Sequence, residues 1–388
     1  MDFGFTDKHQ EILAVVGRIG RENFRDRAAQ YDAGTQSPIE NILDFQRAGL
    51  LNLTIRAEYG GQDSGALGSD PLLYLLAVEE TARYCPGTAQ SMHIHYHATH
   101  LLDRLATAVQ REKFLRPAVE RGALLNATGS EPGRTARGLY GLLTTARKVN
   151  GGYIVNGEKN YATLADVVSF HIVNAVLDGT PAPEGHLALI IPQDSPGLSI
   201  VEGSWNPLGM RAAYSPNILL KDVFVPDENL LGEPGIMPRQ RWQSRFHLSF
   251  AAQYVGASEG IFDFLTDYLP RRGTAGDAFT QLRLGEIRVA IDSARWLVYR
   301  AAWLWQQKQE TEAELNSMLA KYRAIDAAVE VMDKAVQIAG SSALHADSVL
   351  SRLVRDLRVQ TLHENLDKTA ATIGRAHLGQ SYDTTARL

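Results

Sequence analysis

The pattern of apolar residues changes twice along the chain, and this double change limits the fold more than any other feature of the sequence. Residues 1–122 carry apolar side chains at helical spacing, as in "DKHQEILAVVGRIG". Residues 123–235 hold short β-branched or apolar runs broken by Gly, Pro, Asn and Asp, which is typical of strands and turns. Helical spacing returns over residues 236–388. We therefore expect a mainly α protein with a small antiparallel β domain, a barrel or sandwich, between an N-terminal helical domain and a C-terminal helical bundle.

Local signals support the two helical parts. Thr6 is a candidate N-cap for the first helix, and Gly340 is a candidate C-cap for a long helix near the end of the chain. Between residues 284 and 298, one apolar stripe predicts a long bundle helix. Its members are Leu284, Ile287, Ile291, Ala294 and Val298.

The composition narrows the class of protein. The net charge of −5 gives no basic surface for nucleic acid, so we expect no nucleic-acid partner. No apolar run reaches transmembrane length, and the N-terminus has no signal-peptide pattern, so we expect a cytoplasmic protein without a membrane partner. The single cysteine, Cys85, excludes an intrachain disulfide and a cysteine metal cluster.

The richest cluster of titratable residues is "MHIHYHATH", with His93, His95, His97 and His100. On a helix, His93 shares a face with His97 and His100. A metal site usually recruits further ligands from elsewhere, and no HExxH or CxxC motif is present. We therefore expect no metal and interpret His93, His95 and His97 as residues of a polar, substrate-facing helix surface.

Four stretches, in order, resemble the acyl-CoA dehydrogenase superfamily. They are "NATGSEPG" (126–133), "VNGEKNYATLAD" (155–166), "WNPLGMRAAYSPNILLKDVFVPDENLLG" (205–232) and "AVQIAGSSALHADSVLSRLVRDLRVQTLHEN" (335–365). The resemblance covers essentially the whole chain. It implies that the C-terminal part is a four-helix bundle and that the protein is an FAD-dependent oxidoreductase.

The resemblance also implies which residues hold FAD. Ser130 stands at the family's "TEP" threonine, and Thr163 stands at the threonine near flavin N5. Tyr161 takes the place of an aromatic residue that covers the flavin ring. Arg355 and Asp356 match the family's "RD", which we interpret as a structural ion pair or helix-end device.

Other matching positions approach the FAD of a neighbouring subunit, which implies a homodimer or homotetramer. They are Gln337, Gly340 and Ser341, where Ser341 replaces the usual second glycine. The family's "RxxFG" arginine has no match at the usual spacing, and Arg271 or Arg272 is the candidate substitute. The altered spacing implies that FAD is bound more weakly, as an exchangeable substrate.

A further departure concerns the thioester's CoA portion. The family's "EPGxGSD" serine falls on Ala136, although Arg134 and Arg137 could meet a phosphate. The substrate is therefore expected to be an acyl thioester or another small molecule.

Two chemistries follow for "TLHENLDK". In the first, Glu364, aligned with the family's catalytic glutamate, removes the α-proton of an acyl thioester while flavin N5 accepts a hydride. Such a base should be desolvated to raise its pKa. The alternative fate of this glutamate is an exposed helix surface. Dehydrogenation, with an electron-transfer partner, is our first hypothesis.

The second chemistry resembles the monooxygenase branch of the superfamily, which includes dibenzothiophene monooxygenase. There a partner reductase supplies reduced flavin, which reacts with O₂. Leu362-His363-Glu364 echoes that branch's "LHDP", and His345 falls where the branch tends to have a histidine. His363 and the pocket histidines would then carry the chemistry. A flavin-binding homologue without catalysis is the third class.

Overall fold

The computed structural model describes residues 4–133 and 141–385. Arg134, Ala136 and Arg137 lie outside the described residues. The N-terminal helices are α1 (Asp7–Ile19), α2 (Arg25–Gly34), α3 (Ile39–Arg47), α4 (Pro71–Tyr84), α5 (Pro86–Leu105), α6 (Ala108–Gln110) and α7 (Arg116–Arg121). The strands are β1 (Leu125–Thr128), β2 (Thr145–Val149), β3 (Gly152–Lys159), β4 (Phe170–Leu177), β5 (His186–Pro192), β6 (Leu198–Val201) and β7 (Asn217–Pro226). The C-terminal helices are α8 (Ile236–Arg239), α9 (His247–Arg272), α10 (Ala278–Gln306), α11 (Glu310–Ala339), α12 (Val349–Thr361) and α13 (Leu366–His377).

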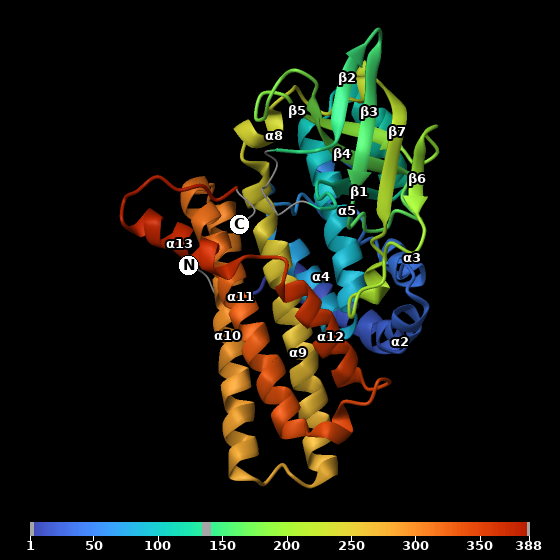
Figure 1. Cartoon of the computed structure of the whole chain (residues 1–388). Helices are drawn as coiled ribbons and strands as arrows, with labels where there is room; N and C mark the ends of the chain where they lie inside the picture. Colours follow the sequence, from blue (N-terminus) through green and yellow to red (C-terminus); the bar gives the residue numbers. More distant parts are fainter. Residues whose placement is uncertain (1–3, 134–140, 386–388) are drawn as a thin grey trace.

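The strands form one seven-stranded sheet in the order β1-β4-β2-β3-β7-β6, with β5 paired to β4. The expected antiparallel pairing holds for β2–β3, β3–β7, β4–β5 and β6–β7. β1 and β2, however, both run parallel to β4, so the sheet is mixed. A bulge between Val155 and Gly157 bends β3 against β7. The β domain lies at one end of the molecule in Figure 1, above the long helices.

Helices α9, α10, α11 and α12 form the C-terminal bundle, and α4 packs along α9 from the N-terminal part (Figure 1). One continuous hydrophobic core joins these helices to the N-terminal ones. The predicted stripe on α10 is confirmed, because Ile287, Ile291, Ala294 and Val298 are buried and Leu284 is partly buried against the same core. The mainly α architecture with a central β domain is therefore confirmed.

Both predicted helix caps are also confirmed. The Thr6 side chain accepts a hydrogen bond from the backbone N–H of His9, which completes a capping box at the start of α1. Gly340 ends α11 with φ 73°, a conformation that favours glycine. Over the described ranges, every helix is too short or too polar to cross a membrane. The same residues contain no cluster of three or more His, Cys, Asp or Glu side chains able to hold a metal ion.

Candidate functional site

Glu364 lies in the short turn between α12 and α13, and its side chain is turned inward. Only 3% of that side chain is exposed, and its carboxylate forms an ion pair with Lys321 of α11, which is equally buried. The hydroxyl of Thr369, in the first turns of α13, donates a hydrogen bond of 2.9 Å to the other carboxylate oxygen. The exposed helix surface considered above for Glu364 is therefore wrong.

The electrostatics of Glu364 differ from those expected of a family base. Burial by itself raises the pKa of this carboxyl group, but the charges of Lys321 and His247 and the hydrogen bonds from Lys321 and Thr369 together outweigh burial. The net effect lowers the pKa of Glu364 below its usual value. The expected raised pKa is therefore wrong, and the side chain is an ionised carboxylate at neutral pH.

An aromatic cluster connects Glu364 to the interior of the N-terminal helices. The ring of Phe250, in the first turn of α9, stacks on His363 with centroids 4.3 Å apart. The same ring lies 4.3 Å from the ring of His93 on α5, and Lys321 Nζ lies 5.0 Å from its centroid. Cation–π contact of this kind stabilises a buried ammonium group. Phe250 thus lies between the two residues of "HE" and the histidines of α5.

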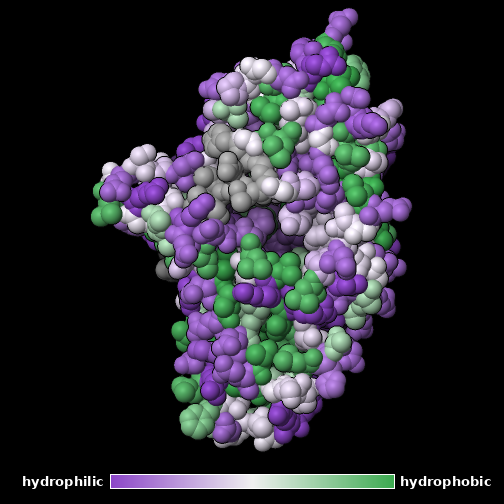
Figure 2. Space-filling model, viewed as in Figure 1, coloured by the Kyte–Doolittle hydropathy of each residue, from purple (hydrophilic) through white to green (hydrophobic). Residues whose placement is uncertain are grey.

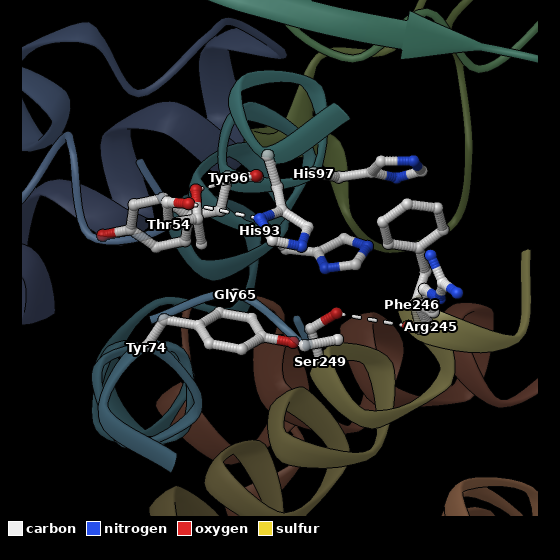
Figure 3. Close-up of a pocket in the computed structure, with 11 residues that line it drawn as sticks. Thr54, Gly65, Tyr74, His93, Tyr96, His97, Arg245, Phe246 and Ser249 are labelled. Atoms are coloured by element: carbon white, nitrogen blue, oxygen red, sulfur yellow. Dashed lines mark hydrogen bonds between the residues drawn. The ribbon is translucent and has the colours of Figure 1, made fainter. Parts of the chain in front are cut away.

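A cavity opens beside this cluster, between α4, α5 and the start of α9 (Figure 3). His93, His97 and His100 line it, as their shared helix face predicts. His95 does not belong to this lining, because a two-residue step places it on another side of α5. Its Nδ1 accepts a hydrogen bond of 3.2 Å from the backbone N–H of Leu125 in β1. His95 therefore joins α5 to the sheet, which corrects its assignment to the substrate pocket.

Ser130 lies in a loop that a buried ion pair holds in place. Its neighbour Glu131 is paired at 2.8 Å with Lys159, at the end of β3, and the side chains are 1% and 0% exposed. The backbone N–H groups of Leu143 and Thr144 also donate to this carboxylate, at 2.7 and 2.8 Å. The backbone N–H of Asn160 donates to the Ser130 carbonyl, so the loop is fixed against β3.

Thr163 and Tyr161 lie just beyond β3, in different surroundings. Thr163 is buried, and its hydroxyl shares a 2.8 Å hydrogen bond with Ser215. Tyr161 is 63% exposed with φ 57°, and its ring meets the edge of Trp205 at 6.2 Å. Asn160 directly precedes Tyr161, and its Oδ1 is buried with no hydrogen-bond partner among residues 4–133 and 141–385. An open aromatic face beside an unused acceptor suits a flat, polar-edged ring such as a flavin.

The remaining residues proposed for FAD lie around the C-terminal end of α9, which is far from the β domain in Figure 1. Arg272 ends that helix and packs against Gly340, where a Cβ would stand 2.8 Å from the arginine Nη1. Ser341 follows Gly340, and the exposed Gln337 side chain donates to Asp333. The α9–α10 and α11–α12 turns lie far from the sheet in Figure 1. α9 alone has 26 residues, so it is about 39 Å long. The structure therefore divides the predicted FAD residues into two separate groups.

Two further predictions concern the C-terminal helices. Arg355 and Asp356 do not pair with each other, because Arg355 binds Asp32 at 2.6 Å whereas Asp356 accepts from the backbone N–H of Met210. They join α12 to α2 and to the segment before β7, a structural role of a different kind from the one expected. His345 lies exposed in the connection between α11 and α12, away from the α5 histidines.

Sequence reasoning missed the partners of the predicted residues. Lys321 is a lysine on a long amphipathic helix, where most lysines are exposed. Only its position among apolar neighbours in "NSMLAKYRAI" gave a signal. Arg245 and Phe246, which line the cavity with the histidines, precede α9 in a stretch without a motif.

Comparison with known families covers most of the chain. The model "Acyl-CoA dehydrogenase, N-terminal domain" matches residues 6–121, the middle-domain model matches 127–223, and the C-terminal-domain model matches 248–368. The short-chain specific acyl-CoA dehydrogenase of Clostridium acetobutylicum is 28% identical over 94% of this chain and 96% of its own length. The mouse mitochondrial short-chain enzyme is 28% identical over 97% of this chain and 91% of its own.

Solved structures agree. Butyryl-CoA dehydrogenase from Megasphaera elsdenii superposes with a TM-score of 0.89 at 27% identity, covering 97% of this chain and all of that one. Dibenzothiophene monooxygenase (TdsC) from Paenibacillus sp. A11-2 superposes with a TM-score of 0.84 at 22% identity, over 97% and 99% of the two chains. At that identity the second likeness concerns the fold alone.

Proposed function

Because this chain belongs to the acyl-CoA dehydrogenase superfamily of FAD-dependent oxidoreductases, we propose that it catalyses α,β-dehydrogenation of a short acyl thioester. The observation that carries the proposal is Glu364, a buried and ionised carboxylate at the aligned position of the family base. It lies beside the Phe250 cluster and so beside the cavity lined by α5. The relatives' names, short-chain specific acyl-CoA dehydrogenase and butyryl-CoA dehydrogenase, point to a short acyl group.

The residues of the chain divide the work. FAD, when bound, supplies the hydride acceptor. Glu364 takes the α-proton on a carboxylate oxygen, and the Thr369 hydroxyl holds the other oxygen. Lys321 keeps Glu364 ionised before substrate arrives, and the carboxylate must leave Lys321 to reach the substrate. The open ring of Tyr161 and the fixed loop at Ser130 would hold the flavin when it is bound.

We also infer that the working enzyme is a homo-oligomer. The Thr163 group lies in the β domain and the Arg272 group lies at the end of α9 far from that domain, so two copies of the chain would contribute to each FAD. Helix α10 offers a surface for such contact, because Phe279, Val289 and Trp296 are 68%, 69% and 49% exposed. Figure 2 also shows apolar side chains gathered over the bundle on the face in view. Reoxidation of the flavin would then use an electron-transfer partner.

The test is reduction of the bound flavin by butyryl-CoA under anaerobic conditions. The wild type should bleach, and Glu364→Gln should bleach more slowly by a factor of about 10²–10⁴, the usual contribution of a general base. Full-rate bleaching by Glu364→Gln would end the assignment of the base. Because this change leaves Lys321 buried and unpaired, the double variant Glu364→Gln/Lys321→Met serves as the folded control. The double variant should be more stable than Glu364→Gln, and its flavin should still bleach slowly.

One observation favours a second candidate, a monooxygenase supplied with reduced flavin by a reductase. His363 and His93 contact the ring of Phe250, and His93 and His97 line the cavity, so several imidazoles lie at the place proposed for the substrate. Protein that consumes O₂ with reduced flavin and forms an oxygenated product, and is not bleached by any thioester, would support this candidate. His363→Ala should then uncouple O₂ consumption from product formation, and unchanged coupling would argue against it.

A further inference from the structure

The cavity beside the α5 histidines has an unusual lining for a pocket that would hold an alkyl chain. The enclosed part of the cavity is small, with room for about one water-sized group such as a terminal oxygen, and the ≈ 240 Å³ around it includes the open mouth. Figure 3 shows Tyr74 and Ser249 on one side and His93 and Tyr96 on the other. Phe246 lies beside His97 at one end, and Arg245 lies next to it. Polar side chains therefore reach the cavity from α4, α5 and the segment before α9.

Arg245 is a buried cation with incomplete pairing. Its side chain is 8% exposed, and its contact with the largely exposed Glu310 is long, at 3.4 Å. The guanidinium carbon lies 4.8 Å from the Trp242 ring centroid. Nε is buried and has no hydrogen-bond partner within residues 4–133 and 141–385. Burial lowers the pKa of Arg245, and the nearby Glu310 and Glu314 offset that only in part.

His100 brings an unmet acceptor to the same cavity. The residue is 2% exposed, and its Nδ1–H donates to the Thr54 carbonyl at 3.2 Å. That hydrogen bond fixes the tautomer, so Nε2 carries a lone pair, and Nε2 also lacks a partner in the described part of the chain. Burial, together with the positive charges of Arg104 and Arg245, lowers the pKa of His100 to about 3. The imidazole therefore stays neutral.

An alkyl end in this cavity would leave both the Arg245 donor and the His100 acceptor buried without partners. Buried polar groups are nearly always hydrogen-bonded, and leaving one unmet is costly. We propose that the cavity takes an acyl group whose far end bears a carboxyl or carboxamide oxygen, which accepts from Arg245. This inference rests on the proposed dehydrogenation and names its substrate class. It also separates this chain from relatives named for butyryl-CoA.

Three CoA thioesters of equal chain length test the proposal: pentanoyl-CoA, glutaryl-CoA and 4-carbamoylbutanoyl-CoA. Their dissociation constants are measured calorimetrically on the FAD-loaded enzyme, and their kcat/KM values are measured as anaerobic flavin bleaching. At least one oxygen-ended thioester should bind more tightly than pentanoyl-CoA by about ten-fold or more, as expected for a hydrogen bond to a charged donor. Preference for glutaryl-CoA would mean that the Arg245 charge is recognised. Preference for the carboxamide would mean that its N–H also donates a hydrogen bond to His100 Nε2.

Arg245→Met should remove the preference, whereas Arg239→Met, an arginine change on the exposed side of α8, should keep it. Arg245→Lys is the second variant in case the methionine protein does not fold, and it should reduce the preference because lysine has no Nε–H donor. The proposal would be overturned if the wild type bound pentanoyl-CoA as tightly as, or more tightly than, the oxygen-ended thioesters. It would also be overturned if Arg245→Met and Arg245→Lys both kept the wild-type preference. If no thioester bleaches the flavin, dehydrogenation fails, and the order of the dissociation constants still decides the identity of the acyl end.

Discussion

Two buried glutamate–lysine pairs, one in the β domain and one in the bundle, use the same chemical groups in different ways. Glu131 and Lys159 are 1% and 0% exposed, and Glu364 and Lys321 are both 3% exposed. The Glu131 carboxylate also accepts from two backbone amides, of Leu143 and Thr144. The Glu364 carboxylate accepts from the side-chain ammonium of Lys321 and the side-chain hydroxyl of Thr369.

The difference lies in what would have to move to release each carboxylate. Backbone amides hold Glu131, so releasing it means moving the chain itself. Side chains hold Glu364, which stands in a turn, so a change of rotamers is enough to release it. Lys159 and the two backbone amides lower the pKa of Glu131 to about 2 despite burial. The pKa of Glu364 is lowered despite burial by side chains alone, those of Lys321, His247 and Thr369. The Glu131–Lys159 pair is therefore fixed by the backbone, whereas the Glu364 carboxylate can leave Lys321 when a substrate binds.

The largest expected effect is on stability, from Glu131→Gln. This change leaves Lys159 as a buried, unpaired charge, which typically costs about 3–5 kcal/mol. The urea midpoint of unfolding should fall strongly, and the apparent Tm with it. The wild-type pair contributes stability that is present above pH ~4.5 and lost as the pH falls towards 2, because the folded-state pKa is the lower one. The acid transition of the variant should lack that contribution.

The matched control for this prediction is Glu158→Gln, one residue from Lys159 on β3. Glu158 is only partly buried and accepts from the Asn217 amide, a hydrogen bond that glutamine can also accept. Its midpoint should change little. A Glu131→Gln protein as stable as this control would mean that the two pairs do not differ in the way described.

The next effect concerns pH and comes from Lys321→Met. Without the ammonium group, burial dominates, so the pKa of Glu364 should rise above its usual value. The acid limb of kcat/KM for flavin reduction should then move to higher pH, because the base must be ionised to act. The pH dependence of the free energy of unfolding should also change sign. Where Glu364 titrates, ionisation stabilises the folded wild type as the pH rises, whereas in the variant the same ionisation should destabilise it.

Lys334→Met, on the same helix, is the control, because Lys334 pairs with Glu330 and Glu286 near the surface. Its pH profile should match that of the wild type. If Lys321→Met lowered stability without moving the acid limb, Lys321 would be a structural residue only, and the charge on Glu364 would not depend on it.

The sequence predicted the elements whose signals are local. The change from helical to strand periodicity, the cap at Thr6 and the glycine at Gly340 each depend on a few neighbouring residues, and each is confirmed. The parallel pairing of β1 and β2 with β4 was missed, because the partner of a strand is chosen by contacts far along the chain. His95 was assigned to the wrong face, although helical spacing alone separates it from His93 and His97.

The candidate site was predictable in position but not in environment. Alignment to "RD" placed Glu364, and the structure puts it beside the aromatic cluster. Its pKa could not be predicted, because Lys321 lies 43 residues away and on another helix. Arg245 had no motif, and its importance appears only where α4, α5 and the start of α9 meet. Motifs identify side chains that take part in chemistry, whereas the charges around those side chains come from the packing of distant elements.

The smallest expected effect comes from Thr369→Val, which removes one donor from Glu364 and leaves Lys321 in place. A hydrogen bond to an ionised group contributes about 1.5–3 kcal/mol net, so the Tm should fall, but by less than in Glu131→Gln. The acid limb of flavin reduction should move upward in pH by less than in Lys321→Met, because the hydroxyl contributes less than the lysine to the lowered pKa of Glu364. Thr372→Val, a buried threonine one turn further along α13, is the control. If both valine variants behaved alike, Thr369 would not hold Glu364, and Lys321 would be the main restraint to be broken when substrate binds.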